Sequence, residues 1–274
     1  MFSNLIVIPA RYGSTRLPGK PLMPLAGVPL LSRVIRIAQA AVLAADHSDR
    51  VEIVVATDDE RVADLAADEG ATVMLSNPAI SNGSLRALDA AIRQEQCPRR
   101  VVNLQGDAAF ITPAVLGALL MHMRDSEVDV LTPVIQLDWC ALDRLRLRKR
   151  DVPFSGTTCV RTHGGQALWF SKMVLPAIRD EASLRAASPL SPVWQHVGLY
   201  GYTLAALERF ATLPMSRYEH LEGLEQLRML EAGMCIQTIE VAWGPWSVSG
   251  IDSPQDLVRA EEEIAAYGDP LDYT

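Results

Sequence analysis

Apolar and polar positions follow two different periods along the first half of the chain. Four short runs rich in β-branched residues are each followed by a polar or glycine-containing segment, a pattern typical of buried strands. These runs lie at 5–9, 51–56, 72–75 and 101–104. Between them, apolar residues recur at three- and four-residue spacing, which predicts helices. The helices are expected from Leu30 to about 42, over 60–69, over 86–95, and from the Thr112–Pro113 pair to about 124. Strands that alternate with helices predict an α/β fold with a doubly wound, mostly parallel sheet.

The regular alternation ends after Pro133. A basic, leucine-rich segment at 142–150 precedes apolar segments at 157–162 and 167–171, which flank a His-Gly-Gly turn, and 176–192 lacks clear periodicity. We interpret about 136–194 as an inserted α/β subregion, suited to ligand contacts or subunit pairing, within a single domain that spans 1–274. Regular patterns then return, and they predict a helix at about 220–232, a strand at 236–241 and a helix at 254–267.

The composition limits the classes of protein to consider. Hydrophobic residues make up 49% of the 274 residues and charged residues 21%, the balance of a globular protein with a full core. The net charge of −8 argues against a nucleic-acid partner or an anionic membrane surface. No apolar run approaches the ~20 residues of a membrane span, and no signal-peptide pattern opens the chain. The four cysteines form no Cys-x-x-Cys pair, so we expect mostly buried thiols, without a zinc site or disulfide framework, in a cytoplasmic protein.

A glycine-rich, basic loop at 9–21 follows the first predicted strand, where α/β sheets bind ligands. Small residues allow backbone N–H groups to turn inward around an anion, and Arg11, Arg16 and Lys20 add positive charge. The small residues are Ala10, Gly13, Ser14 and Thr15. The loop fits neither the phosphate-binding loop of nucleotide triphosphatases nor the dinucleotide fingerprint. The alternative is a solvated basic loop with no ligand.

The stretch 8–30 carries the form R-x-G-S-T-R-L-P-G-K-P-L and resembles sugar nucleotidyltransferases, above all the 3-deoxy-D-manno-octulosonate (Kdo) cytidylyltransferase family. The resemblance implies transfer of CMP from CTP to an acidic sugar, with release of pyrophosphate. Enzymes that activate sialic acids carry related loops, so the loop indicates the reaction class better than the sugar. The resemblance assigns nucleotide contacts to Pro9, Ala10, Arg11, Gly13, Ser14, Thr15, Lys20, Asn82, Gly83, Arg86 and Gln105.

Two carboxylates are candidates for a metal site. Asp107 ends the segment Asn-Leu-Gln-Gly-Asp after the fourth predicted strand, and Asp252 precedes the last predicted helix. Taken alone, the first suits a turn and the second a helix cap. Beside a phosphate-binding loop, however, a hard cation is expected, because Mg²⁺ uses one or two carboxylates together with substrate phosphates. Both segments also resemble the family's metal-binding motifs. The implied catalytic set is Asp107 and Asp252 on Mg²⁺, with Arg16 and Lys20 on the triphosphate.

Two later blocks extend the resemblance towards the sugar end of the site. Residues 195–202 resemble the family pattern H-x-G-x-Y-x-Y, and 219–228 resemble E-x-x-E-x-L-E-Q-L-R. By position, the resemblance assigns acceptor contacts to His196, Tyr200, Glu225 and Gln226. The alternatives are ordinary strand residues for the first pair and a solvated helix face for the second.

Three positions depart from the family pattern. Ala108 replaces a Glu, Leu85 replaces an Asp or Glu, and Thr158 aligns with a Lys. Either Arg161 and Lys172 compensate, or the enzyme takes another sugar acid, or the protein is a weakly active or silent nucleotide-binding relative. The implied partners are CTP and a small sugar acid, with neither nucleic acid nor membrane. The resemblance further implies a homodimer and a place in lipopolysaccharide biosynthesis.

Overall fold

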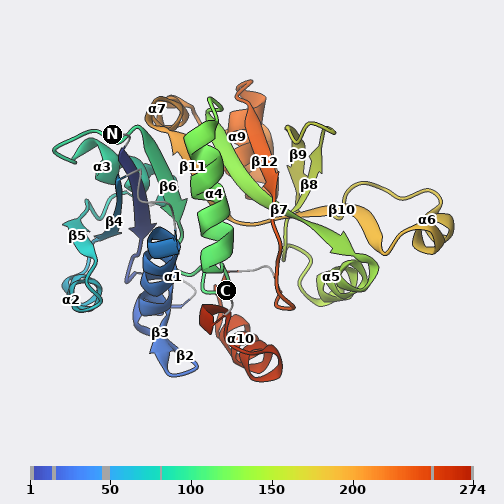
Figure 1. The fold of residues 1–274 in the computed structure, drawn as a ribbon, viewed down its shortest axis with the longest axis horizontal. Helices are drawn as coiled ribbons and strands as arrows, with labels where there is room; N and C mark the ends of the chain where they lie inside the picture. Colours follow the sequence, from blue (N-terminus) through green and yellow to red (C-terminus); the bar gives the residue numbers. More distant parts are fainter. Residues whose placement is uncertain (1–2, 14–16, 45–49, 81, 248–249, 273–274) are drawn as a thin grey trace.

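Four parallel strands form the first half of the central sheet in the computed structural model, which describes residues 3–13, 17–44, 50–80, 82–247 and 250–272. Their order is β5-β4-β1-β6. They are β1 (Ser3–Pro9), β4 (Arg50–Thr57), β5 (Thr72–Leu75) and β6 (Arg100–Leu104). Each matches a strand predicted from the sequence, and together they lie at one end of the sheet (Figure 1).

The sheet continues through β11 (Leu199–Thr203), which pairs antiparallel with β6, to β7 (Val130–Asp138) and β12 (Ile236–Glu240). In the run β5-β4-β1-β6-β11-β7-β12 only β11 is antiparallel, so the expected mostly parallel sheet is confirmed. A second branch leaves β7 and is antiparallel throughout. Its strands are β10 (Leu190–His196), β8 (Thr158–Arg161) and β9 (Ala167–Ser171).

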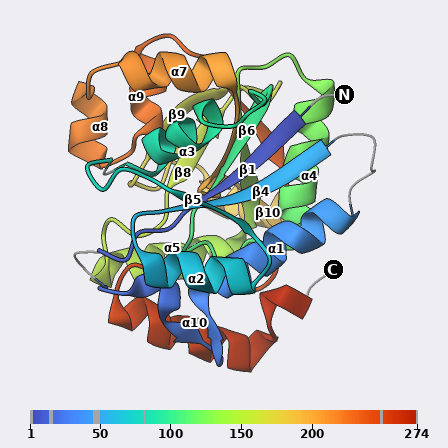
Figure 2. The same ribbon diagram turned by 90° about the vertical axis from the view of Figure 1, so that its left-hand side faces the viewer.

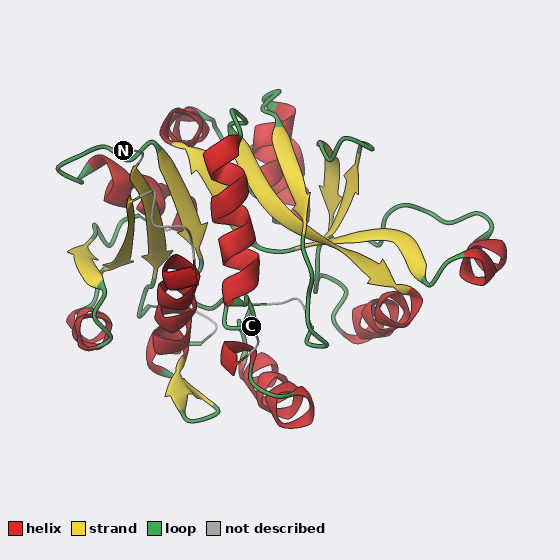
Figure 3. Ribbon diagram, viewed as in Figure 1, coloured by secondary structure: helices red, strands yellow, loops and turns green. Residues whose placement is uncertain are grey.

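The segment at 176–192, expected to lack regular structure, contains a helix and the start of a strand. The helix α6 (Glu181–Ala187) has no buried residues, so no apolar period marks it in the sequence. Ion pairs join α6 to the helix at 139–151 instead. The Arg146 guanidinium binds the Glu181 carboxylate at 2.9 Å, and the Arg185 guanidinium binds Asp143. α6 and α5 (Trp139–Asp151) both lie at the end of the molecule formed by the second branch (Figure 3).

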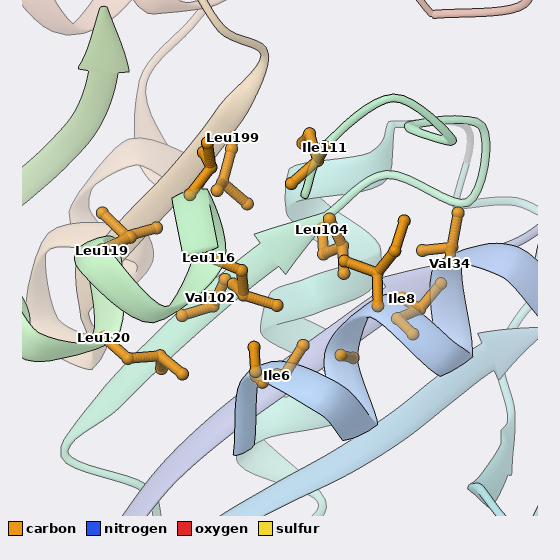
Figure 4. Packing of buried hydrophobic residues seen from close by; sticks show 14 of the residues in the cluster. Ile6, Ile8, Val34, Val102, Leu104, Ile111, Leu116, Leu119, Leu120 and Leu199 are labelled. Atoms are coloured by element: carbon orange, nitrogen blue, oxygen red, sulfur yellow. The ribbon is translucent and has the colours of Figure 1, made fainter. Parts of the chain in front are cut away.

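Helices cover both faces of the parallel strands, because alternate strand residues point to opposite sides. Ile6 and Ile8 of β1 pack under one layer of helices, whereas Leu5 and Val7 pack under the other. The first layer holds α1 (Leu30–Ala44), α2 (Glu60–Asp68) and α4 (Pro113–Asp125). The second holds α3 (Gly83–Ile92), α7 (Leu204–Thr212) and α9 (Gln226–Glu231). Figure 2 shows the two layers on either side of the sheet, and Figure 4 shows the buried side chains of the first. The doubly wound arrangement is therefore confirmed.

Smaller elements complete the chain. The hairpin β2 (Pro24–Leu25) and β3 (Val28–Pro29) follows the short helix η1 (Lys20–Leu22). The helix α10 (Pro254–Tyr267) has the predicted bounds, and η2 (Pro270–Asp272) ends the described chain. All four cysteines are free, but only Cys159 is buried, so the expectation of mostly buried thiols is wrong. None of the helices in the described ranges is long and apolar enough to cross a membrane.

Two helix boundaries differ from the prediction and shape the site. α3 begins at Gly83 because the Asn82 side chain caps it, accepting hydrogen bonds from the backbone N–H groups of Ser84 and Leu85. The helix expected at 220–232 is interrupted after α8 (Arg217–Glu222) by Gly223, whose φ of 64° ends that helix. A new helix, α9, therefore begins at Glu225 and Gln226. The break at Gly223, and not a continuous helix, sets the positions of these two residues.

Candidate active site

The start of the basic loop is fixed between neighbouring strands. The Ala10 N–H donates to the Ala56 carbonyl at 3.0 Å, and the Pro9 carbonyl accepts from the Gly106 N–H at 3.3 Å. Arg11 is half-buried and Gly13 is exposed. Ser14, Thr15 and Arg16 lie outside the described residues, so their predicted phosphate contacts stay predictions. The loop therefore leaves the carboxyl end of β1, as the sequence predicted, directly beside the end of β6.

Lys20 joins the two candidate metal carboxylates. Its Nζ lies 2.5 Å from Asp107 Oδ2 and 3.1 Å from Asp252 Oδ1. Burial opposes the charge of the ammonium group, but the two carboxylates outweigh it and raise the pKa of Lys20. Residues separated by 232 positions thus meet at one point. The Lys20 ammonium therefore compensates part of the negative charge of the two carboxylates.

Asp252 is not a helix cap, although its position before Ser253–Pro254 allowed that interpretation. Ser253 caps α10, with its hydroxyl accepting from the Asp256 N–H while the Asp256 carboxylate accepts from the Ser253 N–H. This capping box orders the turn without using the Asp252 carboxylate. The side chain of Asp252 is 43% exposed and reaches Lys20. The structure therefore favours the ligand interpretation over the capping one.

A cavity of about 580 Å³ opens beside these carboxylates. Eight of the predicted site residues line it: Gly83, Gln105, Asp107, His196, Tyr200, Glu225, Gln226 and Asp252. They come from the start of α3, the end of β6, the β10–β11 junction, the start of α9 and the turn before α10. The fold thus brings five separate sequence blocks into one pocket of a size that suits a small substrate.

His196 is neutral in this pocket. It is 8% exposed, and burial together with the nearby Lys172 ammonium lowers its pKa to about 3. Its Nε2 lies 2.9 Å from Thr132 Oγ1, whose hydroxyl also lies 2.8 Å from the Leu199 carbonyl oxygen. Because the carbonyl can only accept, the Thr132 hydroxyl donates its proton to the Leu199 carbonyl. The hydroxyl oxygen therefore accepts from His196, which carries its proton on Nε2. Nδ1 is then a hydrogen-bond acceptor.

Glu225 and Gln226 do not form the solvated helix face considered from the sequence. Gln226 is 3% exposed, and the Glu225 carboxylate accepts hydrogen bonds from Asn82 Nδ2 at 2.8 Å and Ser84 Oγ at 2.6 Å. The network continues through Asn103 Nδ2, which donates to Ser84 Oγ at 3.1 Å, to the side chain of Gln105. Residues predicted for the nucleotide and for the acceptor are therefore parts of one hydrogen-bonded wall.

Arg86 lies outside the pocket, although the resemblance assigns it a nucleotide contact. Its side chain is 1% exposed, and the guanidinium donates to the Ile80 carbonyl at 2.7 Å and pairs with Asp58 at 3.2 Å. It also donates to the Ser76 hydroxyl. In this structure Arg86 anchors the segment that leads to Asn82. Gly83, by contrast, is tightly packed, since a Cβ there would lie 2.9 Å from the amide atoms of Gln105.

The three departures from the family pattern have different positions. Ala108 lines the pocket, so the loss of a carboxylate there changes its wall. Leu85 does not line it, and Thr158 is fully buried, with its hydroxyl donating to the Met173 carbonyl at 2.6 Å. Of the two suggested compensating cations, Arg161 packs over the Trp194 ring, whereas Lys172 lines the pocket and donates to Thr157 Oγ1 at 3.1 Å.

Several pocket residues were not predicted from the sequence. The segment 152–157, between α5 and β8, contributes one wall, and Phe154 within it is 73% exposed at the rim. Arg148, Trp243 and Asp256 also line the cavity. Arg148 and 152–157 lie in the subregion 136–194 that we considered for ligand contacts, but no motif singles out individual residues there. They reach the pocket from loop and helix ends that only the tertiary fold brings together.

The carboxylates suit a metal ion that is shared with a substrate. Asp107 and Asp252 contact the same ammonium group, so one cation can be reached by both. Within the described ranges, no three His, Cys, Asp or Glu side chains are grouped so as to hold an ion. A donor set of two carboxylate side chains fits Mg²⁺ that takes its other ligands from phosphates and water.

Comparison with known proteins agrees with this geometry. The family model for cytidylyltransferases matches residues 5–238. A 3-deoxy-manno-octulosonate cytidylyltransferase of Maricaulis maris is 42% identical over 97% of this chain and 99% of its own length. One of Anaeromyxobacter dehalogenans is 38% identical over 95% of this chain and 97% of its own. A solved structure of CMP:2-keto-3-deoxy-manno-octonic acid synthetase complexed with CTP has a TM-score of 0.78 at 32% identity, covering 96% of this chain and 99% of that one. The chain therefore belongs to the 3-deoxy-manno-octulosonate cytidylyltransferase family.

Proposed function

We propose that this protein transfers the CMP group of CTP to the anomeric hydroxyl of 3-deoxy-manno-octulosonate, or of a closely related 2-keto-3-deoxy sugar acid. The sugar oxygen forms a bond to the α-phosphorus and loses its proton, while the bond from that phosphorus to the pyrophosphate oxygen breaks. The observation that carries the proposal is the meeting of Lys20, Asp107 and Asp252 beside a pocket lined by His196 and Glu225. The groups that we propose for binding the phosphates and the sugar are therefore adjacent.

The nucleotide is proposed to bind between the basic loop and the ends of β1 and β6. Backbone N–H groups of the loop donate hydrogen bonds to the phosphates. The Lys20 ammonium can exchange its ion pairs with the carboxylates for an ion pair with the triphosphate. Mg²⁺, held by Asp107 and Asp252 when it is bound, supplies compensation for charge that develops on the pyrophosphate. Most of the catalytic effect is then positioning and charge stabilisation rather than covalent chemistry.

The acceptor is proposed to occupy the other half of the pocket. An acid needs a cation, and two basic side chains line this cavity, those of Arg148 and Lys172. The neutral His196 ring offers Nδ1 as an acceptor to a sugar hydroxyl. The Glu225 carboxylate keeps acceptor capacity beyond its bonds to Asn82 and Ser84, because each carboxylate has about four lone-pair sites.

A different sugar acid is the second candidate substrate, and Ala108 is the observation that favours it. The wall at this position lacks a carboxylate that the family pattern carries, so a hydroxyl facing it would be left without an acceptor, at a cost of roughly 1–3 kcal/mol. Such a pocket favours an acid with fewer or altered hydroxyls. Lys172 favours the family's usual sugar acid instead, because it lines the same cavity and supplies a cation in place of the lysine that Thr158 replaces.

Pyrophosphate release tests both the reaction and the acceptor. The purified protein is assayed with CTP, UTP, ATP and GTP against Kdo and its deoxy, amino and nine-carbon analogues, with and without excess chelator. We expect CTP to be preferred and chelator to abolish turnover. The Asp107→Asn variant controls for contaminating activity. Preference for ATP, or release that is equal in chelator, would contradict the nucleotide or the metal assignment, respectively. No release with any sugar acid would favour a silent nucleotide-binding relative.

The family resemblance also leads us to propose a cytoplasmic homodimer that acts in lipopolysaccharide biosynthesis. Sedimentation equilibrium of the purified chain tests the assembly, with a mass of twice the 30.0 kDa of one chain expected. A mass equal to one chain across the accessible concentration range would contradict it.

A further inference from the structure

The hairpin of β8 and β9 has both of its ends at the wall of the pocket. The segment 153–157 enters β8, and Lys172 follows directly after β9. Ser155, Gly156, Thr157 and Lys172 all line the cavity. Their relative spacing therefore decides the shape of this wall, although they lie on opposite ends of the hairpin.

One side chain contacts both ends. Lys149 Nζ donates to the Lys172 carbonyl at 2.6 Å and to the Gly156 carbonyl at 3.1 Å. It also donates to the Ser155 carbonyl and lies 3.4 Å from the Pro153 carbonyl oxygen. The ammonium group is thus surrounded by backbone oxygens from the two chain segments that frame the pocket. A compact ammonium with three protons suits such a convergence of carbonyls.

We propose that Lys149 is a positioning residue for the acceptor half of the site: its ammonium group gathers the carbonyls of Ser155, Gly156 and Lys172 and so sets the distance between segment 153–157 and the Lys172 side chain. Lys149 itself does not line the cavity. It acts through the wall that the acceptor contacts, and the inference rests on the proposed function for the identity of that acceptor. The nucleotide half, held by β1, β6 and the basic loop, does not depend on this contact.

The charge state of Lys149 supports the same role. Burial, together with the neighbouring Lys172 and Arg148, lowers its pKa to about 8, while Glu222 opposes the shift. These three are the charged groups that face it from the end of β9, from its own helix α5 and from α8. Since the folded-state pKa lies below the usual 10.5, the ammonium is lost as pH rises through about 8. A neutral amine keeps only two protons and binds carbonyls more weakly.

Kinetics with two substrates test the inference. We expect Lys149→Met to raise the KM for the sugar acid at least tenfold while the KM for CTP stays within twofold. Arg144→Met is the matched control, because Arg144 is exposed on the same helix and does not line the pocket. An equal rise in both KM values, or no rise in either, would overturn the proposal, since the first indicates general loss of structure and the second no role.

A second variant and a structural measurement complete the test. In the wild type, the acceptor KM should rise more steeply between pH 7 and 9.5 than in Lys149→Arg, which stays charged; any rise caused by Lys172 is common to both proteins. An equal rise in Lys149→Arg assigns the whole titration to another group and contradicts the inference. Amide hydrogen exchange of segment 153–157 should be at least tenfold faster in Lys149→Met and unchanged in Arg144→Met. Unchanged exchange in Lys149→Met refutes the clamp even where no acceptor is turned over, so this result is distinct from failure of the proposed function.

Discussion

Gly106 is the point where the phosphate loop touches the strand that carries Asp107, and replacing it by Ala should displace one against the other. A Cβ on Gly106 would lie 2.9 Å from the Pro9 carbonyl oxygen and 3.3 Å from Ala10 Cβ. Both atoms belong to the backbone or are attached directly to it. Neither can rotate away, so relief requires movement of the loop or of the Asp107 turn.

The size of the effect follows from these distances. The contact with Pro9 is about 0.5 Å shorter than the 3.4 Å at which ordinary van der Waals contact begins. Overpacking of this kind costs about 1–3 kcal/mol of unfolding free energy. A displacement of the same order at Asp107 changes its distance to Lys20, and misplacement by about 1 Å can cost a hundredfold in rate. We therefore expect Gly106→Ala to lower kcat by about tenfold or more.

The same substitution elsewhere in the chain provides the control. Gly117 lies inside α4, and a Cβ built there meets nothing within 4 Å. Gly117→Ala should therefore stabilise the protein by ~0.5–1 kcal/mol through helix propensity, with turnover unchanged. Urea unfolding followed by tryptophan fluorescence measures stability, and pyrophosphate release measures kcat. If Gly106→Ala matches the wild type in both, the approach of β1 to β6 is not rigid and the reasoning fails.

Three further predictions follow from the site and its supports. Asp107→Asn and Asp252→Asn should each lower kcat a hundredfold or more, ~3 kcal/mol of transition-state stabilisation, and near-normal turnover at saturating Mg²⁺ would contradict their ligand role. His196 has a native pKa of about 3 against the usual 6.5, so below pH 6.5 the unfolded chain binds a proton that the native state does not. Stability should therefore fall by about 2 kcal/mol on going to pH 5 through this residue, and His196→Phe should remove that part of the slope in urea titrations. Arg86→Met should cost ~3–5 kcal/mol, because it leaves Asp58 without its buried partner, and a change in urea midpoint equivalent to less than 1 kcal/mol would refute the anchoring role.

The fold was predictable wherever a segment carries its own periodicity. The strands β1 and β6 and the second half of β4 are buried on both faces and appear as continuous apolar runs. The edge strand β5 is only partly buried, but its short apolar run also marked it, and α10 has both a serine cap and an apolar stripe. β7 was not predicted, and Pro133 in its middle accounts for this, because proline argues against an interior strand. In the structure its neighbour changes there from β11, paired at Leu131, to β10, paired at Val134. A residue without an N–H is tolerated at that changeover.

The site was predictable in its motifs but not in its side-chain partners. Loops that follow parallel strands meet at one edge of the sheet, which is why Asp107 lies beside the basic loop. The pairing of Lys20 with both aspartates could not be predicted, because it depends on the turn before α10 folding back across 232 positions. For Arg86 the motif itself was misleading. It indicated a nucleotide contact and gave no sign that the guanidinium is buried against Asp58.

A net charge of −8 does not conflict with two anionic substrates, because the charges next to the substrates, and not the net charge of the chain, decide binding. Overall acidity acts at long range and is screened beyond a Debye length of ~8 Å at physiological salt. Lys20 and Lys172 act at contact distance in partly buried positions, where screening is weaker. The Lys20 ammonium is moreover paired with the Asp107 and Asp252 carboxylates. It therefore stays protonated and is not an isolated buried cation. If Asp107 and Asp252 held Mg²⁺, as we propose, the Lys20 ammonium would be free to bind the phosphates of the nucleotide. The position of a few charges therefore matters more for binding an anion than the net charge of the chain.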